Sequence, residues 1–93
     1  MKYSRTEAKT YARTNMKGVW AAALTPFRAS DLAIDEAGFA RNIDHWVGKL
    51  GIDGLFIAGK QGEFFSMSLA ERKRSFEIAV EAVGKRAGTI MSC

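Results

Sequence analysis

A run of four residues, Gly59-Lys60-Gln61-Gly62, has the clearest potential for chemistry in this sequence. Its two glycines permit positive backbone φ angles and a close approach of the backbone to a ligand. Lys60 supplies a positive charge, and Gln61 supplies hydrogen-bond donors and an acceptor. These residue types predict a turn that binds an anionic group of a small substrate. A tight turn with incidental polar residues would show the same pattern, so on spacing alone both interpretations stay open.

The flanking residues predict how this turn is held. Leu55–Ala58 is an unbroken apolar run bounded by glycines, which predicts a buried parallel strand over residues 54–58. Downstream, Ser68-Leu69-Ala70-Glu71 matches a capping box, which predicts a helix over residues 69–83. A strand, a glycine turn and a helix start in this order can gather backbone N–H groups around an anion.

Similar patterns predict the neighbouring elements. Apolar runs predict strands over residues 18–24 and 88–91, and Asp35 is a good N-cap for a helix over residues 36–50. The apolar stripe predicted for that helix consists of Phe39, Ile43, Val47 and Leu50, with Trp46 beside it. The apolar face predicted for the helix over 69–83 consists of Leu69, Phe76, Val80 and Val83, with Ala79 beside it.

The order of these elements predicts an α/β fold. The strands are expected to start near residues 18, 54 and 88, and one helix lies between each successive pair. Two such repeats imply parallel strands joined by right-handed crossovers. The spacing leaves open an open doubly wound sheet or a portion of a (β/α)₈ barrel. In both folds, ligands bind at the carboxyl ends of the strands, where residues 59–62 are predicted to lie.

The net charge of +4 is concentrated in residues 1–17, a basic polar N-terminal extension. Its basic residues recur at helical spacing, so one or two helical turns are expected there. Three interpretations stay open: a solvated extension, a basic arm that contacts acidic lipid or nucleic acid, and a transit-type segment. Because residues 18–93 are neutral in sum, we expect no nucleic-acid partner. A second basic group, Arg72–Arg74, is expected to be solvated and partly paired with Glu77.

Several kinds of site have no candidate residues. One histidine and one cysteine, Cys93, cannot form a typical metal site, and no phosphate-loop pattern is present, so we expect neither metal nor cofactor. No apolar run approaches the length of a membrane span, and no membrane partner is expected. A single cysteine excludes an internal disulfide, which fits a reducing compartment, and we expect a cytoplasmic protein.

Several separate motifs, in order and spacing, resemble the dihydrodipicolinate synthase/N-acetylneuraminate lyase family over residues 18–91. The motifs are Gly18-Val19-Trp20, Leu24-Thr25-Pro26-Phe27, Ile34-Asp35, Gly51-Ile52-Asp53-Gly54-Leu55, Gly59-x-x-Gly62-Glu63 and Ser66-Met67-Ser68-Leu69-Ala70-Glu71-Arg72. The resemblance implies the first βαβαβ portion of a (β/α)₈ barrel of the class I aldolase type. Family members form a Schiff base between a lysine and pyruvate or a related 2-oxo acid. They then make or break a carbon–carbon bond, or eliminate water. Members of the family are usually homo-oligomers.

The sequence departs from the family in the glycine turn. The family turn usually reads Gly-Thr-Thr-Gly-Glu or Gly-Ser-Thr-Gly-Glu, and Lys60 and Gln61 occupy the two hydroxyl positions here. The resemblance implies that Gly59, Lys60, Gln61 and Gly62 bind the substrate carboxylate through backbone N–H groups, which this change preserves. The proton relay through a hydroxyl is lost. Lys60 either pairs with a substrate carboxylate or points to solvent.

The length of the chain sets the expected function. Barrels of this kind need roughly 250 residues, and the resemblance puts the Schiff-base lysine on a sixth strand, beyond Cys93. We therefore expect an N-terminal fragment of a pyruvate-dependent lyase or synthase, with no catalytic residue of its own and inactive alone. The alternative from another class is a small non-enzymatic βαβαβ module for binding or interaction.

Overall fold

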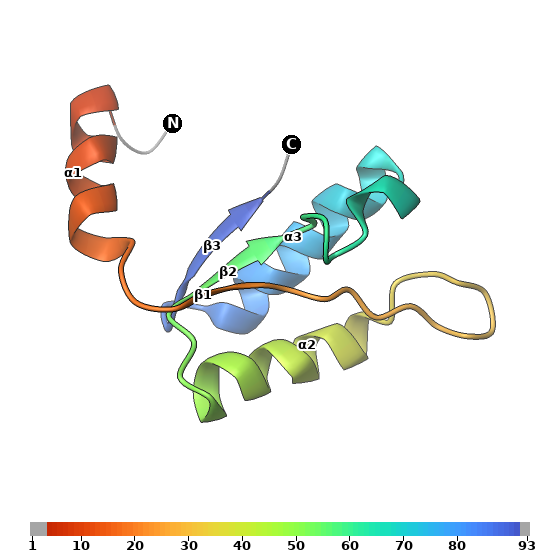
Figure 1. The fold of residues 1–93 in the computed structure, drawn as a ribbon. Helices are drawn as coiled ribbons and strands as arrows, with labels where there is room; N and C mark the ends of the chain where they lie inside the picture. The colour runs from red at the N-terminus through yellow and green to blue at the C-terminus, as the bar shows by residue number, and fades with distance from the viewer. Residues whose placement is uncertain (1–3, 92–93) are drawn as a thin grey trace.

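Three parallel strands form one sheet in the computed structural model, which describes residues 4–91 (Figure 1). The strands are β1 (Trp20–Ala22), β2 (Gly54–Ile57) and β3 (Gly88–Met91), in the order β1-β2-β3. In the register, Ala21 lies opposite Leu55, and Leu55 lies opposite Thr89. The predicted α/β fold with parallel strands is confirmed.

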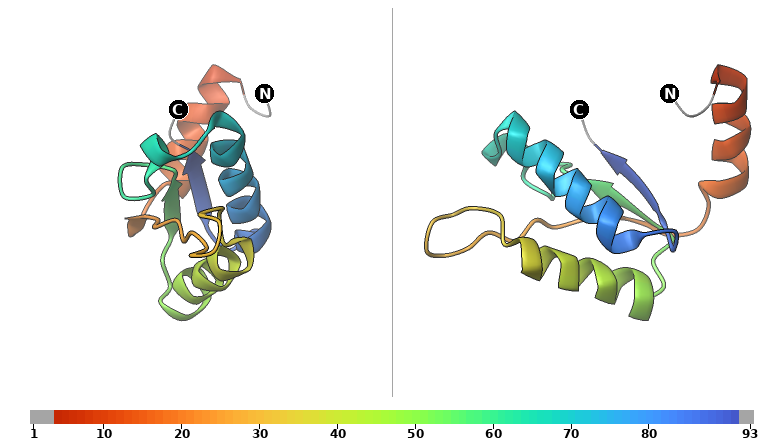
Figure 2. Two further views of the ribbon diagram at one scale, coloured as in Figure 1. Left: turned by 90° about the vertical axis from the view of Figure 1, so that its right-hand side faces the viewer. Right: turned by 180° about the vertical axis from the view of Figure 1, so that it is seen from behind.

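Two helices pack side by side on one face of this sheet (Figures 1 and 2). They are α2 (Glu36–Asp44) and α3 (Leu69–Val83). The side chains of Leu55 and Ile57 are fully buried, whereas Phe56 between them is 38% exposed. Successive side chains of a strand point to opposite faces, so Leu55 and Ile57 face the helices and Phe56 faces the open side.

Both helices start at the predicted caps. The Asp35 carboxylate accepts a hydrogen bond from the Gly38 N–H at 3.0 Å. The Ser68 hydroxyl accepts one from the Glu71 N–H at 3.2 Å, and the Glu71 carboxylate accepts one from the Ser68 N–H at 2.9 Å. These bonds satisfy N–H groups that a helix start leaves without an intrahelical partner.

The second half of the predicted helix over residues 36–50 differs from the prediction. The α-helix ends at Asp44, and His45–Lys49 form a π-helical turn. A π-turn holds more residues than an α-turn and shifts the following side chains around the axis. Leu50 is consequently 59% exposed, so its predicted place in the apolar stripe was wrong, whereas Phe39, Ile43 and Val47 are buried.

The predicted apolar face of α3 was also partly wrong. Leu69 and Val80 are exposed, and the buried residues are Ser75, Ile78, Ala79 and Val83. The buried side includes a serine because its hydroxyl donates a hydrogen bond to the Arg72 carbonyl at 2.7 Å. A polar side chain that finds a partner inside its own helix can face the core at little cost.

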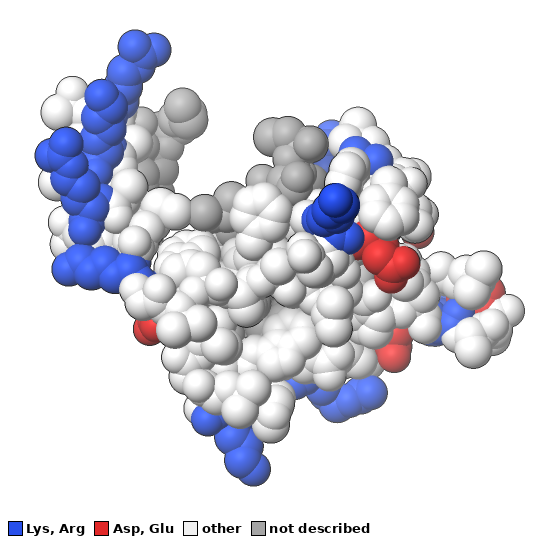
Figure 3. Space-filling view, viewed as in Figure 1, with Lys and Arg blue, Asp and Glu red and all other residues white. Residues whose placement is uncertain are grey.

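The basic N-terminal stretch forms a longer helix than the one or two turns expected. Helix α1 (Arg5–Asn15) begins with a capping box between Ser4 and Glu7, and none of its residues is buried. It stands apart from the sheet and the other helices in Figure 1 and in the right-hand view of Figure 2. Lys and Arg side chains line it in the space-filling view (Figure 3).

The amino ends of the strands are joined by hydrogen bonds to Asp53. Its carboxylate accepts a bond from the Val19 N–H at 2.8 Å, and its backbone N–H donates to the Val19 carbonyl at 2.9 Å. Its carbonyl accepts the Gly88 N–H at 3.1 Å. The ring of Trp20 covers Gly54 and Gly88, where an added Cβ would lie 2.2 and 2.5 Å from ring atoms. These backbone groups at the amino ends of the strands therefore have partners within the protein.

Candidate functional site

The glycine turn lies at the carboxyl end of β2, between the strand and α3. Gly59 and Gly62 are buried, and Lys60 and Gln61 are exposed. The turn is closed by two backbone hydrogen bonds, from the Glu63 N–H to the Lys60 carbonyl at 3.1 Å and from the Phe64 N–H to the Gly59 carbonyl at 3.3 Å. A short 3₁₀-helix, η2 (Phe64–Ser66), then leads into α3.

The glycines of this turn serve close packing, whereas the positive φ angles lie next to them. Ala58 has φ +54° and Glu63 has φ +60°, and neither Gly59 nor Gly62 has a positive φ. The glycines thus do not adopt the positive φ angles that they permit, whereas the close packing that they also permit is present at both. An added Cβ on Gly59 would lie 2.6 Å from the Phe56 ring, and one on Gly62 would lie 3.0 Å from the Ala23 carbonyl oxygen.

Three successive backbone donors in the turn are unpaired. Within residues 4–91, the N–H groups of Lys60, Gln61 and Gly62 donate to no protein acceptor. The Lys60 and Gln61 side chains also form no hydrogen bond or ion pair within that range. Successive free N–H groups in a turn form a concavity that favours an anion, and a nearby ammonium group strengthens the attraction.

Arg72 supports the turn from the start of α3. Its Nε donates hydrogen bonds to the Phe64 carbonyl at 3.0 Å and the Met67 carbonyl at 3.2 Å. Its guanidinium lies 5.2 Å from the centre of the Phe64 ring, which is within the range of a cation–π contact. The sequence interpretation took Arg72 as solvated charge and missed this role. Its position in the first turn after the Ser68 cap was the available signal.

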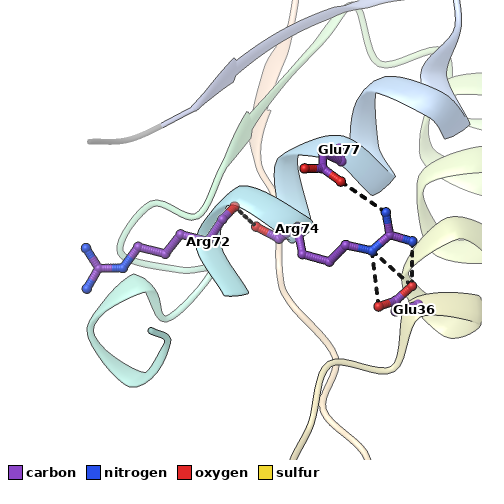
Figure 4. A network of polar contacts seen from close by, with 5 residues as sticks. Glu36, Arg72, Arg74 and Glu77 are labelled. Carbon is purple, nitrogen blue, oxygen red and sulfur yellow. Dashed lines mark hydrogen bonds and ion pairs between the residues drawn. The ribbon is translucent and has the colours of Figure 1, made fainter. Parts of the chain in front are cut away.

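Arg74 points away from the turn and joins α2 to α3 (Figure 4). It pairs with Glu36 at 2.8 Å and with Glu77 at 3.2 Å. The hydrogen bond from Arg74 lowers the pKa of the Glu36 carboxyl below its ordinary value. The predicted Arg74–Glu77 pairing is confirmed, whereas Lys73 has no ion pair within the described part of the chain.

Thr25 lies beyond the end of β1, on the same side of the sheet as the turn. It is 6% exposed, and its buried hydroxyl has no hydrogen-bond partner among residues 4–91. Buried polar groups are normally paired, so this hydroxyl is an exception among the described residues. The sequence interpretation did not single it out.

The described residues contain no other chemical centre of the kinds considered above. In residues 4–91, no three His, Cys, Asp or Glu side chains converge as metal ligands do. No helix within that range has the length and apolar character needed to span a bilayer.

Comparison with known proteins supports the resemblance seen in the motifs. The model of the dihydrodipicolinate synthetase family matches residues 15–92. The chain belongs to this family. N-acetylneuraminate lyase of Escherichia coli is 47% identical over 73 residues, which are 77% of this chain and 24% of the relative. N-acetylneuraminate lyase of Fusobacterium nucleatum is 39% identical over 66 residues, 71% of this chain and 22% of the relative.

Solved structures of the family confirm the fold. N-acetylneuraminate lyase from Mycoplasma synoviae superimposes with a TM-score of 0.80 at 30% identity, covering 85% of this chain and 27% of that one. Dihydrodipicolinate synthase from Bacillus clausii superimposes with a TM-score of 0.77 at 32% identity, covering 84% and 26%. The predicted portion of a (β/α)₈ barrel is thus confirmed. This member of the dihydrodipicolinate synthetase family spans about a quarter of the length of the relatives that it matches.

Proposed function

We propose that residues 59–62 bind the carboxylate of a pyruvate-like 2-oxo acid in a Schiff-base lyase or synthase. The reaction would be aldol-type cleavage or formation of a carbon–carbon bond, or a dehydration. The observation that carries the proposal is the row of three unpaired N–H groups of Lys60, Gln61 and Gly62 at the carboxyl edge of the sheet. Ligands of barrel enzymes bind at this edge, and membership of the family supports a 2-oxo acid as the ligand.

The proposal assigns binding to this chain and the covalent step to a lysine elsewhere. None of the three strands β1, β2 and β3 carries a lysine, and the family resemblance puts the Schiff-base lysine on a sixth strand. Lys60 follows the second strand and cannot take its place. The 93 residues are therefore expected to be inactive alone. The same proposal includes a cytoplasmic, homo-oligomeric enzyme that needs no cofactor.

The test of binding is a titration of the ¹⁵N-labelled chain with pyruvate. We expect the amide signals of residues 60–62 to move more than the others. Gly62→Ala should weaken binding about tenfold, the scale of one hydrogen bond to a charged group, because its Cβ would meet the Ala23 carbonyl oxygen at 3.0 Å. The control is Gly48→Ala, whose Cβ would meet only the end of the Arg86 side chain at 3.1 Å. Equal weakening by both variants would contradict the proposal.

The test of the missing amine is reduction with borohydride in the presence of labelled pyruvate. A Schiff base would be trapped as a stable secondary amine, which carries the label. We expect no label on the 93-residue chain. Stoichiometric labelling that depends on pyruvate would show that this chain already holds a reactive lysine.

A further inference from the structure

Lys60 brings an unused positive charge to the edge of the proposed carboxylate site. Its side chain is exposed and forms no ion pair or hydrogen bond within residues 4–91. Glu63, three residues along, is also exposed and does not pair with it. By contrast, Arg28, Arg74 and Arg86 are each held by an acidic side chain. The charge of Lys60 is therefore available to a ligand.

The backbone position of Lys60 decides which part of a ligand its ammonium group would meet. Its own N–H is one of the free donors, so the side chain starts at the site itself. A carboxylate bound by the N–H groups of residues 60–62 would satisfy those donors without using the ammonium group. The ammonium sits on a long, flexible stem and can reach past the first carboxylate to a second anionic group.

We infer that Lys60 is a specificity-determining residue that makes this site prefer 2-oxo acids with a second carboxylate over pyruvate-like acids with one. The inference rests on the proposed function, since it needs the turn to bind the first carboxylate. Gln61 is neutral and adds no such preference. A hydroxyl at position 60 could bind a second carboxylate but would add no charge, so the Lys60 side chain is what distinguishes the two classes of acid.

The experiment compares two acids that differ only at the far end. 2-Oxoglutarate and 2-oxopentanoate have the same chain length, and a carboxylate in the first replaces a methyl group in the second. Each is titrated into the ¹⁵N-labelled chain, and the amide signals of residues 60–62 give the dissociation constants. We expect 2-oxoglutarate to bind about fivefold more tightly, the scale of an exposed ion pair. The preference should shrink at high salt, which screens exposed charges.

Two variants separate the role of Lys60 from that of net charge. Lys60→Met should reduce the ratio of the two dissociation constants to about one, the value expected once the ion pair is gone. Lys49→Met removes the same charge from an exposed residue of the π-turn that precedes β2, and should leave the ratio unchanged. Should Lys60→Met fail to fold, Lys60→Gln removes the same charge and should also reduce the ratio to about one.

The outcomes distinguish this inference from the function on which it rests. If neither acid moves the signals of residues 60–62, the proposed binding function is overturned together with the inference. If both acids bind there equally well, the function stands and the role of Lys60 is wrong. A preference that survives Lys60→Met or high salt, or that Lys49→Met abolishes, also overturns the role of Lys60.

Discussion

The two edges of the sheet differ in how their backbone groups are satisfied. At the amino edge, Asp53 binds backbone groups of Val19 and Gly88, and the Trp20 ring covers the glycines beside it. At the carboxyl edge, the N–H groups of residues 60–62 have no acceptor within residues 4–91. The three strands thus have paired backbone groups at their amino ends, whereas free N–H donors lie beyond the carboxyl end of β2.

This difference separates stability from function along the strands. In barrel enzymes the carboxyl-end loops carry the site, and the amino-end face serves stability. Substitutions at the amino edge should therefore lower the free energy of unfolding and leave the intrinsic affinity of the turn unchanged. Substitutions at the carboxyl edge should weaken the binding of the ligand.

The largest expected effect is at Gly54, on the amino edge. Gly54→Ala would put a Cβ 2.2 Å from the Trp20 ring, and we expect the free energy of unfolding to fall by about 3 kcal/mol, the upper range for an overpacked site. Chemical denaturation measures the change. In a Trp20→Ala background the same substitution should cost much less, because the ring that it meets is gone. An equal cost in both backgrounds would show that the ring is not the cause.

The next effect is at Arg72, on the carboxyl edge. Arg72→Met removes two hydrogen bonds to the carbonyls of Phe64 and Met67 and a cation–π contact. We expect the free energy of unfolding to fall by about 1.5 kcal/mol. Amide hydrogen exchange in residues 63–67 should become faster, and pyruvate should bind more weakly. Arg72→Lys keeps the charge but lacks the planar guanidinium, so it should recover only part of the effect. Unchanged pyruvate affinity in Arg72→Met would remove this residue from the support of the site.

The sequence predicted the order of the elements and the position of the turn because those depend on local chemistry. The Asp35 and Ser68 caps act within one helical turn, and both start helices as predicted. The Ser4 and Glu7 pair is also a capping box, and it was present in the sequence as a signal for a full helix at residues 5–15. Local signals of this kind can be read before any tertiary contact is known.

Features that depend on tertiary packing were predicted less well. Helical periodicity gave apolar positions on α3, but the sheet decides which of them is buried, and it buries Ser75 while leaving Val80 exposed. Helical periodicity also did not predict the π-turn, after which Leu50 is exposed. At the turn, glycines permit both a positive φ and a close backbone approach, and the sequence does not decide between the two. The structure uses the space that Gly62 leaves beside the Ala23 carbonyl, which only a folded chain shows.

A smaller effect is expected at Asp53, on the amino edge. Asp53→Asn weakens the bond that the carboxylate accepts from the Val19 N–H at 2.8 Å and keeps the shape of the side chain. Because Asp53 is exposed, the free energy of unfolding should fall by only about 1 kcal/mol. Thermal unfolding measures the loss. The amide signals of residues 60–62 should respond to pyruvate as before, and a changed affinity in this variant would mean that the two edges are coupled.

The smallest effect is expected at Glu36. This residue lies away from both ends of the strands, so it shows the size of an effect that involves neither end. Its pKa is lowered in the folded chain by the hydrogen bond from Arg74. The ion pair therefore contributes stability above the ordinary carboxyl pKa of 4.5, and the contribution is lost as the pH falls through the lower folded pKa. Denaturation at a series of pH values measures this contribution. As the pH falls, the free energy of unfolding should decrease less steeply for Glu36→Gln than for the unmodified chain. Glu81→Gln, at an exposed residue of α3 without an ion pair among residues 4–91, should keep the original pH dependence.

The ion pair between Arg74 and Glu36 is exposed to solvent. Salt should therefore reduce the difference between Glu36→Gln and the unmodified chain. A large difference that persists at high salt would contradict this assignment.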